Sequence, residues 1–375
     1  HEDMSICQQY EEDGVIKYEY NFTYLDMVID DYLSLGLKPF VELGFMPKCL
    51  ASGNNEVFYW KGNTTPPKNY EDWNNLVKAT LRHWISRYGL EEVRTWPFEV
   101  WNEPNLGGFW ENADMDKYFE LYEQTAKAVK EVDPKFQVGG PAICGVDDVR
   151  WMKEFMEFCH TKKVPLDFVT RHAYATDAPT RIGHYIYQEL REPQAVLDEL
   201  QVSRDIIDSY PEYKGMPMHL TEFNTSYVPN NPLHDNNQNA AYIARLLSQL
   251  GDTCASYSYW TFGDIFEENG VPFTPFHGGF GLVANGMITK PTYWTYVFFS
   301  NLFKEAIAKD EYHVVTTLNG EYKITAWNPV IRDDSHINYS SVIELPLKKG
   351  TYCIIKQIVD EETCNPLKAW HNLGA

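Results

Sequence analysis

The stretch Phe98-Glu99-Val100-Trp101-Asn102-Glu103-Pro104-Asn105 decides how the rest of this 375-residue chain is interpreted. Its first residues are strand formers, and Pro97 in front of them favours an extended backbone. Pro104 ends the strand, because proline cannot donate a hydrogen bond to a sheet. The strand therefore delivers an amide and a carboxylate, Asn102 and Glu103, to its C-terminal end. Such a carboxylate is either held in a salt bridge or used in chemistry, since burying an unpaired charge is costly.

A second stretch of the same form is Met218-His219-Leu220-Thr221-Glu222-Phe223-Asn224, which follows Pro217. It is again a short apolar strand that ends in a carboxylate, Glu222. Hydrolysis of a glycosidic bond needs two carboxyl groups, one to protonate the leaving oxygen and one across the sugar ring. Glu103 and Glu222 lie far apart in the chain, so only a fold that brings two strand ends to one rim can make them partners.

Strands and helices alternate on either side of these two stretches. We expect strands at 39–46, 97–103, 137–143, 167–174, 218–224 and 257–262, and helices at 22–36, 70–88, 113–132, 147–162, 194–210, 236–250 and 291–307. This alternation is typical of parallel βα units, and it fits either a (β/α)8 barrel or a doubly wound sheet. No glycine-rich phosphate fingerprint follows any strand, so the nucleotide-binding sheet lacks its signature. Polar residues gather where the strands end, which is the catalytic rim of a barrel.

The two ends of the chain are expected to differ from the alternating part. Helix 22–36 has no legible strand of the alternation before it, and only six strands are legible where a closed barrel has eight. We therefore expect the first two strands and the first helix to be missing, with residues 1–20 irregular apart from short β-like pieces. Short antiparallel strands are expected at 314–317, 322–327, 341–345 and 352–358. The sequence predicts an incomplete (β/α)8 TIM barrel over 1–309 and a small β-sandwich-like region over 310–375.

Six residues near the strand ends are candidates for substrate binding. They are Asn102, His172, Tyr174, Trp260, Glu267 and Glu268. Asn102 would bond the sugar 2-hydroxyl, a contact that strengthens as charge develops in the transition state. His172 and Tyr174 could orient Glu222. The alternative for His172 is an ordinary hydrogen-bonded strand histidine.

The remaining candidates would hold the sugar ring and its hydroxyls. Trp260 would form the floor under the sugar, and its alternative is a core tryptophan. Glu267 and Glu268 would bind hydroxyls, and their alternative is a solvated acidic pair. Two long loops, 47–69 and 263–289, follow strands on the same rim. Because βα loops build the walls of barrel active sites, they predict a closed pocket and an exo-acting enzyme.

The composition excludes some classes of partner. The net charge of −21 argues against nucleic acid, which needs a basic surface, and weakly against polyanionic glycans. No stretch approaches 18 apolar residues, so no membrane span is expected. Seven scattered cysteines without metal-binding spacing indicate reduced thiols in a cytoplasmic protein, with no metal and no cofactor. A secreted form is not excluded, because a mature chain would have lost its signal peptide.

Two motifs together carry a family resemblance. Trp101-Asn102-Glu103-Pro104-Asn105 with Thr221-Glu222-Phe223-Asn224-Thr225-Ser226-Tyr227 resembles the glycoside hydrolase family 39 β-xylosidases, retaining enzymes of the Asn-Glu clan of (β/α)8 barrels. Five further stretches look like the same family, namely 39–47, 139–142, 171–174, 259–262 and 276–281. The resemblance covers nearly the whole chain. It implies that Glu103 is the general acid/base and Glu222 the nucleophile of a double displacement.

The resemblance also implies a substrate and an assembly. The substrate would be terminal β-1,4-linked xylose on short xylo-oligosaccharides, and the assembly a bacterial homo-oligomer such as a tetramer. α-L-Iduronidase belongs to the same family but handles a uronate, and apart from Arg171 no basic residues accompany the motifs here. A non-catalytic carbohydrate-binding barrel is the other alternative. Loss of either glutamate would favour it, and both glutamates are present.

Overall fold

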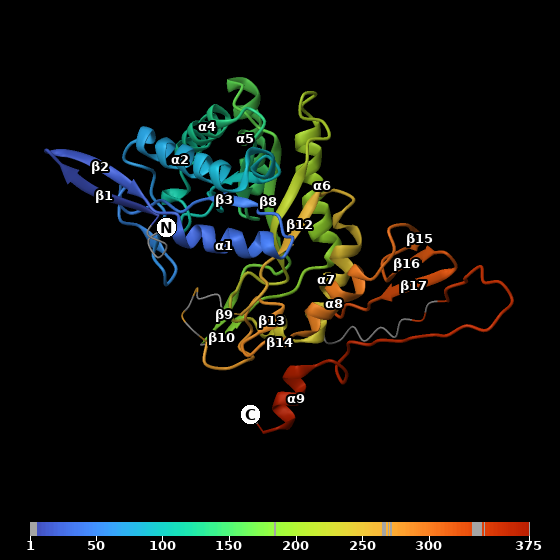
Figure 1. Ribbon diagram of the computed structural model, residues 1–375. Coiled ribbons are helices and arrows are strands. Elements are labelled where there is room, and N and C mark those ends of the chain that lie inside the picture. The colour runs from blue at the N-terminus through green and yellow to red at the C-terminus, as the bar shows by residue number, and fades with distance from the viewer. Residues whose placement is uncertain are drawn as a thin grey trace.

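A computed structural model of the chain describes residues 6–183, 185–264, 268, 270, 272–331, 340 and 342–374. At its centre lies a parallel sheet whose six strands are neighbours in the order in which they occur along the chain (Figure 1). They are β3 (Val41–Leu43), β6 (Pro97–Val100), β7 (Gln137–Ile143), β8 (Phe168–Tyr174), β11 (Met218–Asn224) and β12 (Ser256–Tyr259). This order confirms the predicted succession of parallel βα units. Among the described residues β3 and β12 do not pair with each other, so the curled sheet forms an open half-barrel.

Helices precede, connect and follow these strands, and they pack around the sheet (Figure 1). They are α1 (Thr23–Ser34), α2 (Tyr70–Tyr88), α3 (Leu90–Val93), α4 (Met115–Val132), α5 (Asp148–Lys162), α6 (Pro193–Asp208), α7 (Asn237–Leu250) and α8 (Pro291–Ser300). Helix α2 illustrates why they form. The side chain of Asn69 accepts a hydrogen bond from the backbone N–H of Glu71 at its start, and Gly89 ends it with a φ of 87°. Between these ends, Trp73, Leu81 and further apolar residues face the core.

The core between sheet and helices is unusually aromatic. The largest aromatic side chains with almost no exposure in this core are Trp84, Trp96, Trp101, Trp110, Tyr118, Tyr122, Tyr242, Phe98, Phe136 and Phe155. Phe168 is equally buried but packs against Phe40 and His219, on the same face of β8 as His172. The glycine pair in β7 makes room for them. A Cβ atom on Gly139 would lie 2.3 Å from the backbone oxygen of Phe168, and one on Gly140 would lie 2.8 Å from the hydroxyl of Tyr118. Much of the tryptophan content therefore packs in this core.

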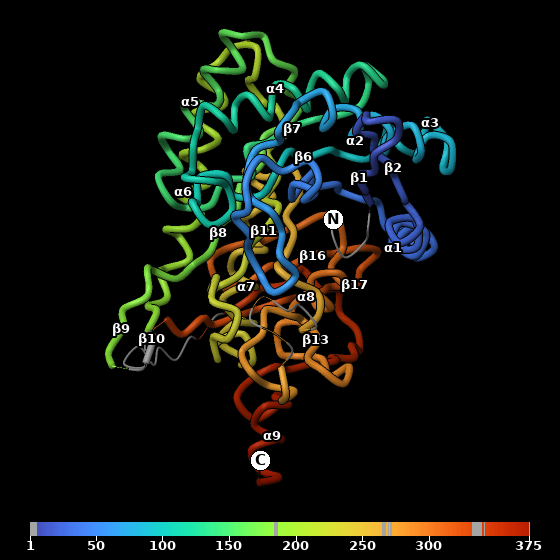
Figure 2. The backbone as a smooth tube through the Cα atoms, turned by 90° about the vertical axis from the view of Figure 1, so that its left-hand side faces the viewer, coloured from blue at the N-terminus to red at the C-terminus, as the bar shows by residue number. Residues whose placement is uncertain are grey.

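Several short hairpins surround the sheet. They are β1 (Cys7–Glu12) with β2 (Val15–Tyr20), β4 (Glu56–Val57) with β5 (Gly62–Asn63), β9 (Thr180–Ile182) with β10 (Tyr185–Tyr187), and β13 (Val283–Ala284) with β14 (Ile288–Thr289). Figure 2 shows the β9–β10 hairpin extending away from the body. The β1–β2 hairpin corrects the prediction of an irregular start over residues 6–20. Its turn is Asp13-Gly14, with φ values of 54° and 73°, the left-handed pair that a two-residue hairpin turn needs.

The C-terminal region agrees with the prediction only in part. Strands β15 (Ala306–Lys309), β16 (His313–Leu318) and β17 (Glu321–Ala326) form an antiparallel sheet, and the last two confirm the strands predicted at 314–317 and 322–327. The helix predicted to reach residue 307 ends at Ser300, because the residues that follow pair with β16. The strands predicted at 342–345 and 352–358 are not formed, since no described strand pairs with them.

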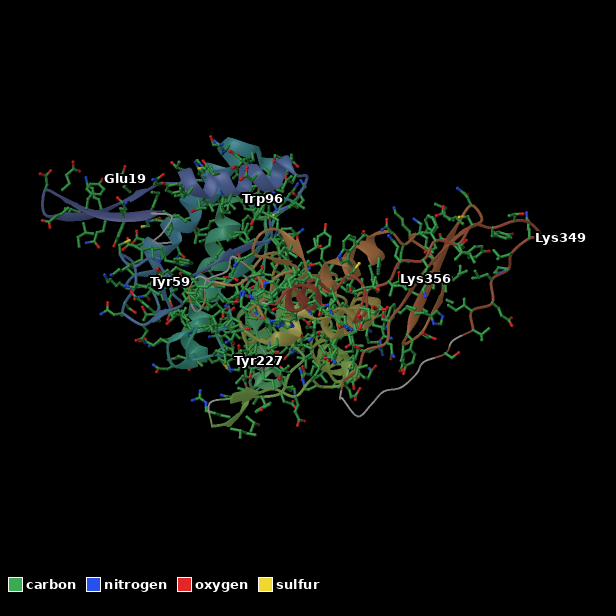
Figure 3. The ribbon with its side chains drawn as sticks, turned by 90° about the horizontal axis from the view of Figure 1, so that it is seen from below. Glu19, Tyr59, Trp96, Tyr227, Lys349 and Lys356 are labelled. Atoms are coloured by element: carbon green, nitrogen blue, oxygen red, sulfur yellow. The ribbon has the colours of Figure 1, made fainter. Side chains whose placement is uncertain are left out.

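A short helix, α9 (Pro366–Asn372), follows in a region predicted to be β-rich. It begins where the side chain of Asn365 accepts a hydrogen bond from the backbone N–H of Lys368. In Figure 3, Glu19 on the β1–β2 hairpin and Lys349 on the segment after β17 lie at opposite ends of the molecule. None of the helices built from the described residues is both long and apolar enough to cross a lipid bilayer.

Candidate active site

The backbone after β6 turns sharply where the strand was predicted to run on to residue 103. Trp101 and Glu103 have φ values of 72° and 44°, and the N–H of Glu103 donates to the oxygen of Ala142 on β7 at 2.9 Å. Trp101 has no exposed surface, and its ring meets that of Trp110 edge-on at 4.9 Å. In a regular strand neighbouring side chains point to opposite faces. Here the turn allows Asn102 and Glu103 both to line one cavity.

In β11 a β-bulge, in place of a turn, directs two successive residues inward. Leu220 pairs with Arg171 on β8, and Glu222 pairs with His172, so Thr221 is an extra residue in a β-bulge. Thr221 donates from its hydroxyl to Glu99 Oε1 at 2.8 Å, on the inner face of the sheet. Because of the bulge, Thr221 and Glu222 are directed inward in succession.

Glu103 and Glu222 meet around His172. Glu103 Oε1 lies 2.8 Å from His172 Nδ1, and Glu222 Oε2 lies 3.4 Å from the same nitrogen. One oxygen of each glutamate and this nitrogen all lie within 4.8 Å of one another. The hydroxyl of Tyr174 donates to Glu222 Oε2 at 2.8 Å. His172 therefore contacts both carboxylates and hydrogen-bonds Glu103, where the sequence predicted a role toward Glu222 alone.

Burial and mutual charge shift the protonation equilibria of this cluster. Burial raises the pKa of Glu222 to about 7; the Glu103 carboxylate adds to the rise, while His172 and the Tyr174 hydroxyl oppose it. Burial lowers the pKa of His172, but the carboxylates of Glu222 and Glu103 outweigh it and raise that pKa to about 9. At neutral pH His172 is therefore a cation between two acidic groups. Burial and the same two carboxylates raise the pKa of Glu268 to about 7.

A cavity of about 620 Å³ opens above the two glutamates, within the usual range for small-ligand pockets. Its lining includes six of the residues predicted from the sequence to bind substrate or catalyse, namely Asn102, Glu103, Tyr174, Glu222, Trp260 and Glu268. Asn102 Oδ1 is buried and has no hydrogen-bond partner among the described residues. His172 lies directly beneath with 1% of its surface exposed. Glu267 lies outside the described residues.

The cavity also has walls that the sequence interpretation did not assign to individual residues. Phe45, Phe58, Trp60 and Phe109 line one side together with Leu106, and Tyr227 and Phe280 line others. Phe58 and Trp60 come from the loop 47–69, which was predicted to build a wall but without naming them. Arg171, singled out as the one basic residue near the motifs, is not part of this lining. It is fully buried on the outer side, 3.0 Å from Asp148.

Within the described part of the chain, Glu103, His172 and Glu222 are the residues grouped closely enough to hold a metal ion. Their ligand atoms are already engaged in hydrogen bonds, since His172 Nδ1 is bonded to Glu103 Oε1 and Glu222 Oε2 accepts from the Tyr174 hydroxyl. A metal would have to break both hydrogen bonds. The donor set therefore fits acid/base chemistry better than metal binding, and the absence of a metal stays a prediction.

Comparison with known proteins gives this site a family. A family model described as glycosyl hydrolases family 39 matches residues 1–375. A β-xylosidase of Geobacillus stearothermophilus is 48% identical over 377 residues, covering 100% of this chain and 74% of its own. A β-xylosidase of Caldicellulosiruptor saccharolyticus is 37% identical over 386 residues, covering 100% and 76%. The crystal structure of a monomeric β-xylosidase from Caulobacter crescentus CB15 matches with a TM-score of 0.87 and 34% identity, covering 100% and 78%. The chain belongs to glycosyl hydrolases family 39.

Proposed function

We propose that this protein is a retaining exo-β-xylosidase, with Glu222 as nucleophile and Glu103 as general acid/base. The observation that carries the proposal is the approach of the two carboxylates, which bring one oxygen each within 4.8 Å at the floor of a cavity. Retaining glycosidases hold their carboxyl groups about 5–5.5 Å apart, whereas inverting enzymes need roughly 6.5–9.5 Å to admit a water. An approach of two oxygens this close is in line with the shorter, retaining separation, which favours double displacement.

The contacts of the two glutamates suit these roles. Glu222 attacks the anomeric carbon, and the hydrogen bond from Tyr174 aims its carboxylate. Glu103 has one oxygen engaged by His172, which leaves the other to carry the proton to the leaving oxygen. In the second step Glu103 accepts a proton from the water that releases the sugar. The unpartnered amide oxygen of Asn102 supports a role for this side chain in binding the 2-hydroxyl.

The charges around the cavity favour a neutral sugar over a uronate. The charged residues among its described lining are Glu42, Glu103, Asp177, Glu199, Glu222 and Glu268, with Arg191 as the single cation. Arg191 is already paired with Glu199 and donates to the oxygen of Tyr174 at 2.7 Å. A uronate would meet several carboxylates and no uncommitted cation within this lining. The names of the full-length relatives then select xylose among neutral sugars.

A panel of nitrophenyl glycosides followed by proton NMR tests the proposal. Nitrophenyl β-D-xyloside should be the preferred substrate, and the first-formed xylose should be the β-anomer. Glu222→Ala should be inactive, with azide restoring turnover as the α-azide, while Glu103→Ala should give the β-azide on activated substrates. An α-anomer from the wild type would refute retention. Early release of xylobiose from xylohexaose without xylose would refute exo action.

The larger architecture belongs to this proposal as well. We infer that the half-barrel is part of a (β/α)8 barrel, because its strands follow chain order and its catalytic residues occupy the C-terminal ends. Residues 1–309 would form the barrel part and 310–375 the β-rich accessory part of a sandwich. A homo-oligomer, with a tetramer as the expected form, is likewise a proposal. Light scattering of the purified protein would test it.

A further inference from the structure

The segment Phe276–Gly281 forms a wall of the cavity but has no role in the mechanism above. Phe280 lines the cavity beside Trp260. One side chain joins these two residues, because Asn224 Nδ2 donates to the backbone oxygen of Trp260 at 2.7 Å and lies 3.3 Å from that of Phe280. The ring of His234 packs against Phe280 with centroids 5.2 Å apart. The segment is thus fixed to the residue proposed as the sugar floor.

Behind this segment lies a fully buried lysine, Lys290, directly before α8. Its Nζ is 2.6 Å from Asp235 Oδ1, 2.6 Å from Asp264 Oδ2 and 2.7 Å from the backbone oxygen of Gly279. Lys290 therefore forms ion pairs with both aspartates and donates a hydrogen bond to the backbone oxygen of Gly279. The cluster joins three chain segments distant in sequence, namely the turn before α7, the residues after β12 and the start of α8.

The two aspartates hold the segment from the other side of the same cluster. Asp235 Oδ2 accepts from the N–H of Gly278 at 2.6 Å, and Asp264 Oδ1 accepts from the N–H of Gly281 at 2.6 Å. The contact requires glycine. A Cβ atom on Gly279 would lie 2.5 Å from Asp264 Oδ1, and one on Gly281 would lie 2.6 Å from the backbone nitrogen of Asp264. The lysine and both aspartates thus grip the backbone on either side of Phe280.

We propose that Lys290, Asp235 and Asp264 are positioning residues that hold Phe280 as the wall of the sugar subsite over Trp260. This inference rests on the proposed function. A buried ion cluster adds little to the free energy of unfolding on its own, because well-packed apolar residues in its place often stabilise a protein equally well. Its hydrogen bonds are directional, however, and they fix a loop that packing alone would leave adjustable. The cluster should therefore act on substrate binding through Phe280.

A double-mutant cycle tests the proposal, with kcat and KM measured on whichever nitrophenyl glycoside the wild type hydrolyses. Asp235→Asn should lower kcat/KM by about tenfold to a hundredfold, mainly through KM, as expected for a displaced binding wall. Phe280→Ala should have an effect of similar size. Because both act through one side chain, the double variant should be no worse than Phe280→Ala. Effects that multiply, or an unchanged KM in Asp235→Asn, would overturn the proposal.

A matched control separates positioning from stability. Asp133 is the residue at which α4 ends, and one of its carboxylate oxygens lies 2.7 Å from the guanidinium of Arg94. It comes just before β7 begins, so it lies at the N-terminal edge of the sheet, away from the cavity. Asp133→Asn should lower Tm but leave KM unchanged. If Asp235→Asn does not fold, Asp264→Asn takes its place in the cycle. A wild type that hydrolyses no β-xyloside would refute the proposed function, whereas a wild type active on another glycoside would still test the cluster.

Discussion

The hydrogen bond from Tyr174 to Glu222 gives the most direct test of the site. It spans 2.8 Å, and both side chains line the cavity. A hydrogen bond to a charged group contributes about 1.5–3 kcal/mol. Tyr174→Phe removes this donor while keeping the ring. The carboxylate form of Glu222 then loses that stabilisation, whereas its protonated form loses little.

The sign of the expected shift follows from this difference. A donor that favours the charged form lowers the pKa, so removing it raises the pKa of Glu222 above its present value of about 7. At 1.36 kcal/mol per pKa unit, the loss corresponds to a rise of roughly 1–2 units. In the proposed mechanism Glu222 must be ionised to attack, so the acidic limb of kcat/KM should move to higher pH by that amount. At pH 7 the ionised fraction, and with it kcat/KM, should fall by roughly fivefold to fiftyfold.

The assay is the pH profile of kcat/KM on nitrophenyl β-D-xyloside from pH 4 to 9. Tyr227→Phe is the matched control, because its ring meets that of Tyr174 at 6.2 Å and lines the same cavity, while its hydroxyl interacts with Gln188. The control should keep the wild-type acidic limb. The reasoning fails if Tyr174→Phe leaves this limb in place, or if both variants shift it equally.

Three further outcomes are expected. Asn102→Ala should lower kcat/KM on the xyloside by about a hundredfold but have little effect on the 2-deoxyxyloside, which lacks the hydroxyl that Asn102 would bind; equal losses on both would argue against this contact. Gly139→Ala should lower the free energy of unfolding, measured by urea denaturation, by about 1–3 kcal/mol, because the new Cβ would lie 2.3 Å from the backbone oxygen of Phe168. Gly107→Ala should leave it unchanged, because open space surrounds that position. Dialysis against a chelator should leave turnover unchanged, and metal analysis of the dialysed enzyme would complete the check.

The alternation of apolar segments was enough to predict the central sheet. Five of its six strands bury apolar side chains, with β12 as the exception, and the longer connecting helices each have an apolar stripe that packs on the sheet. These patterns are local in sequence and strong in period. Predictions failed where partners decide the structure. Residues 352–358 contain strand formers, yet they form no strand, because strands need pairing that a local sequence does not supply.

The candidate site was predictable in composition but not in shape. Glu103 and Glu222 could be chosen because each ends a buried strand, and parallel strands bring such ends to one edge. The aromatic wall of Phe58 and Trp60 could not be resolved, because a long loop gives no periodic pattern to follow. The buried cluster around Lys290 was equally hidden. Its two aspartates come from separate loops, and nothing in their local sequence marks them as partners.

The two strands that lead to the proposed catalytic glutamates share a requirement that regular β-structure cannot meet. Each must direct two successive residues inward, Asn102 with Glu103 and Thr221 with Glu222, although successive strand residues alternate between faces. The first strand solves this by ending in left-handed residues, and the second by inserting Thr221 as a bulge. Left-handed backbone is costly for residues with a side chain, so the buried ring of Trp101 and the hydrogen bond from Glu103 N to Ala142 must hold the turn in place. The packing around these strand ends therefore matters for the proposed mechanism, because it brings both carboxylates to the same cavity.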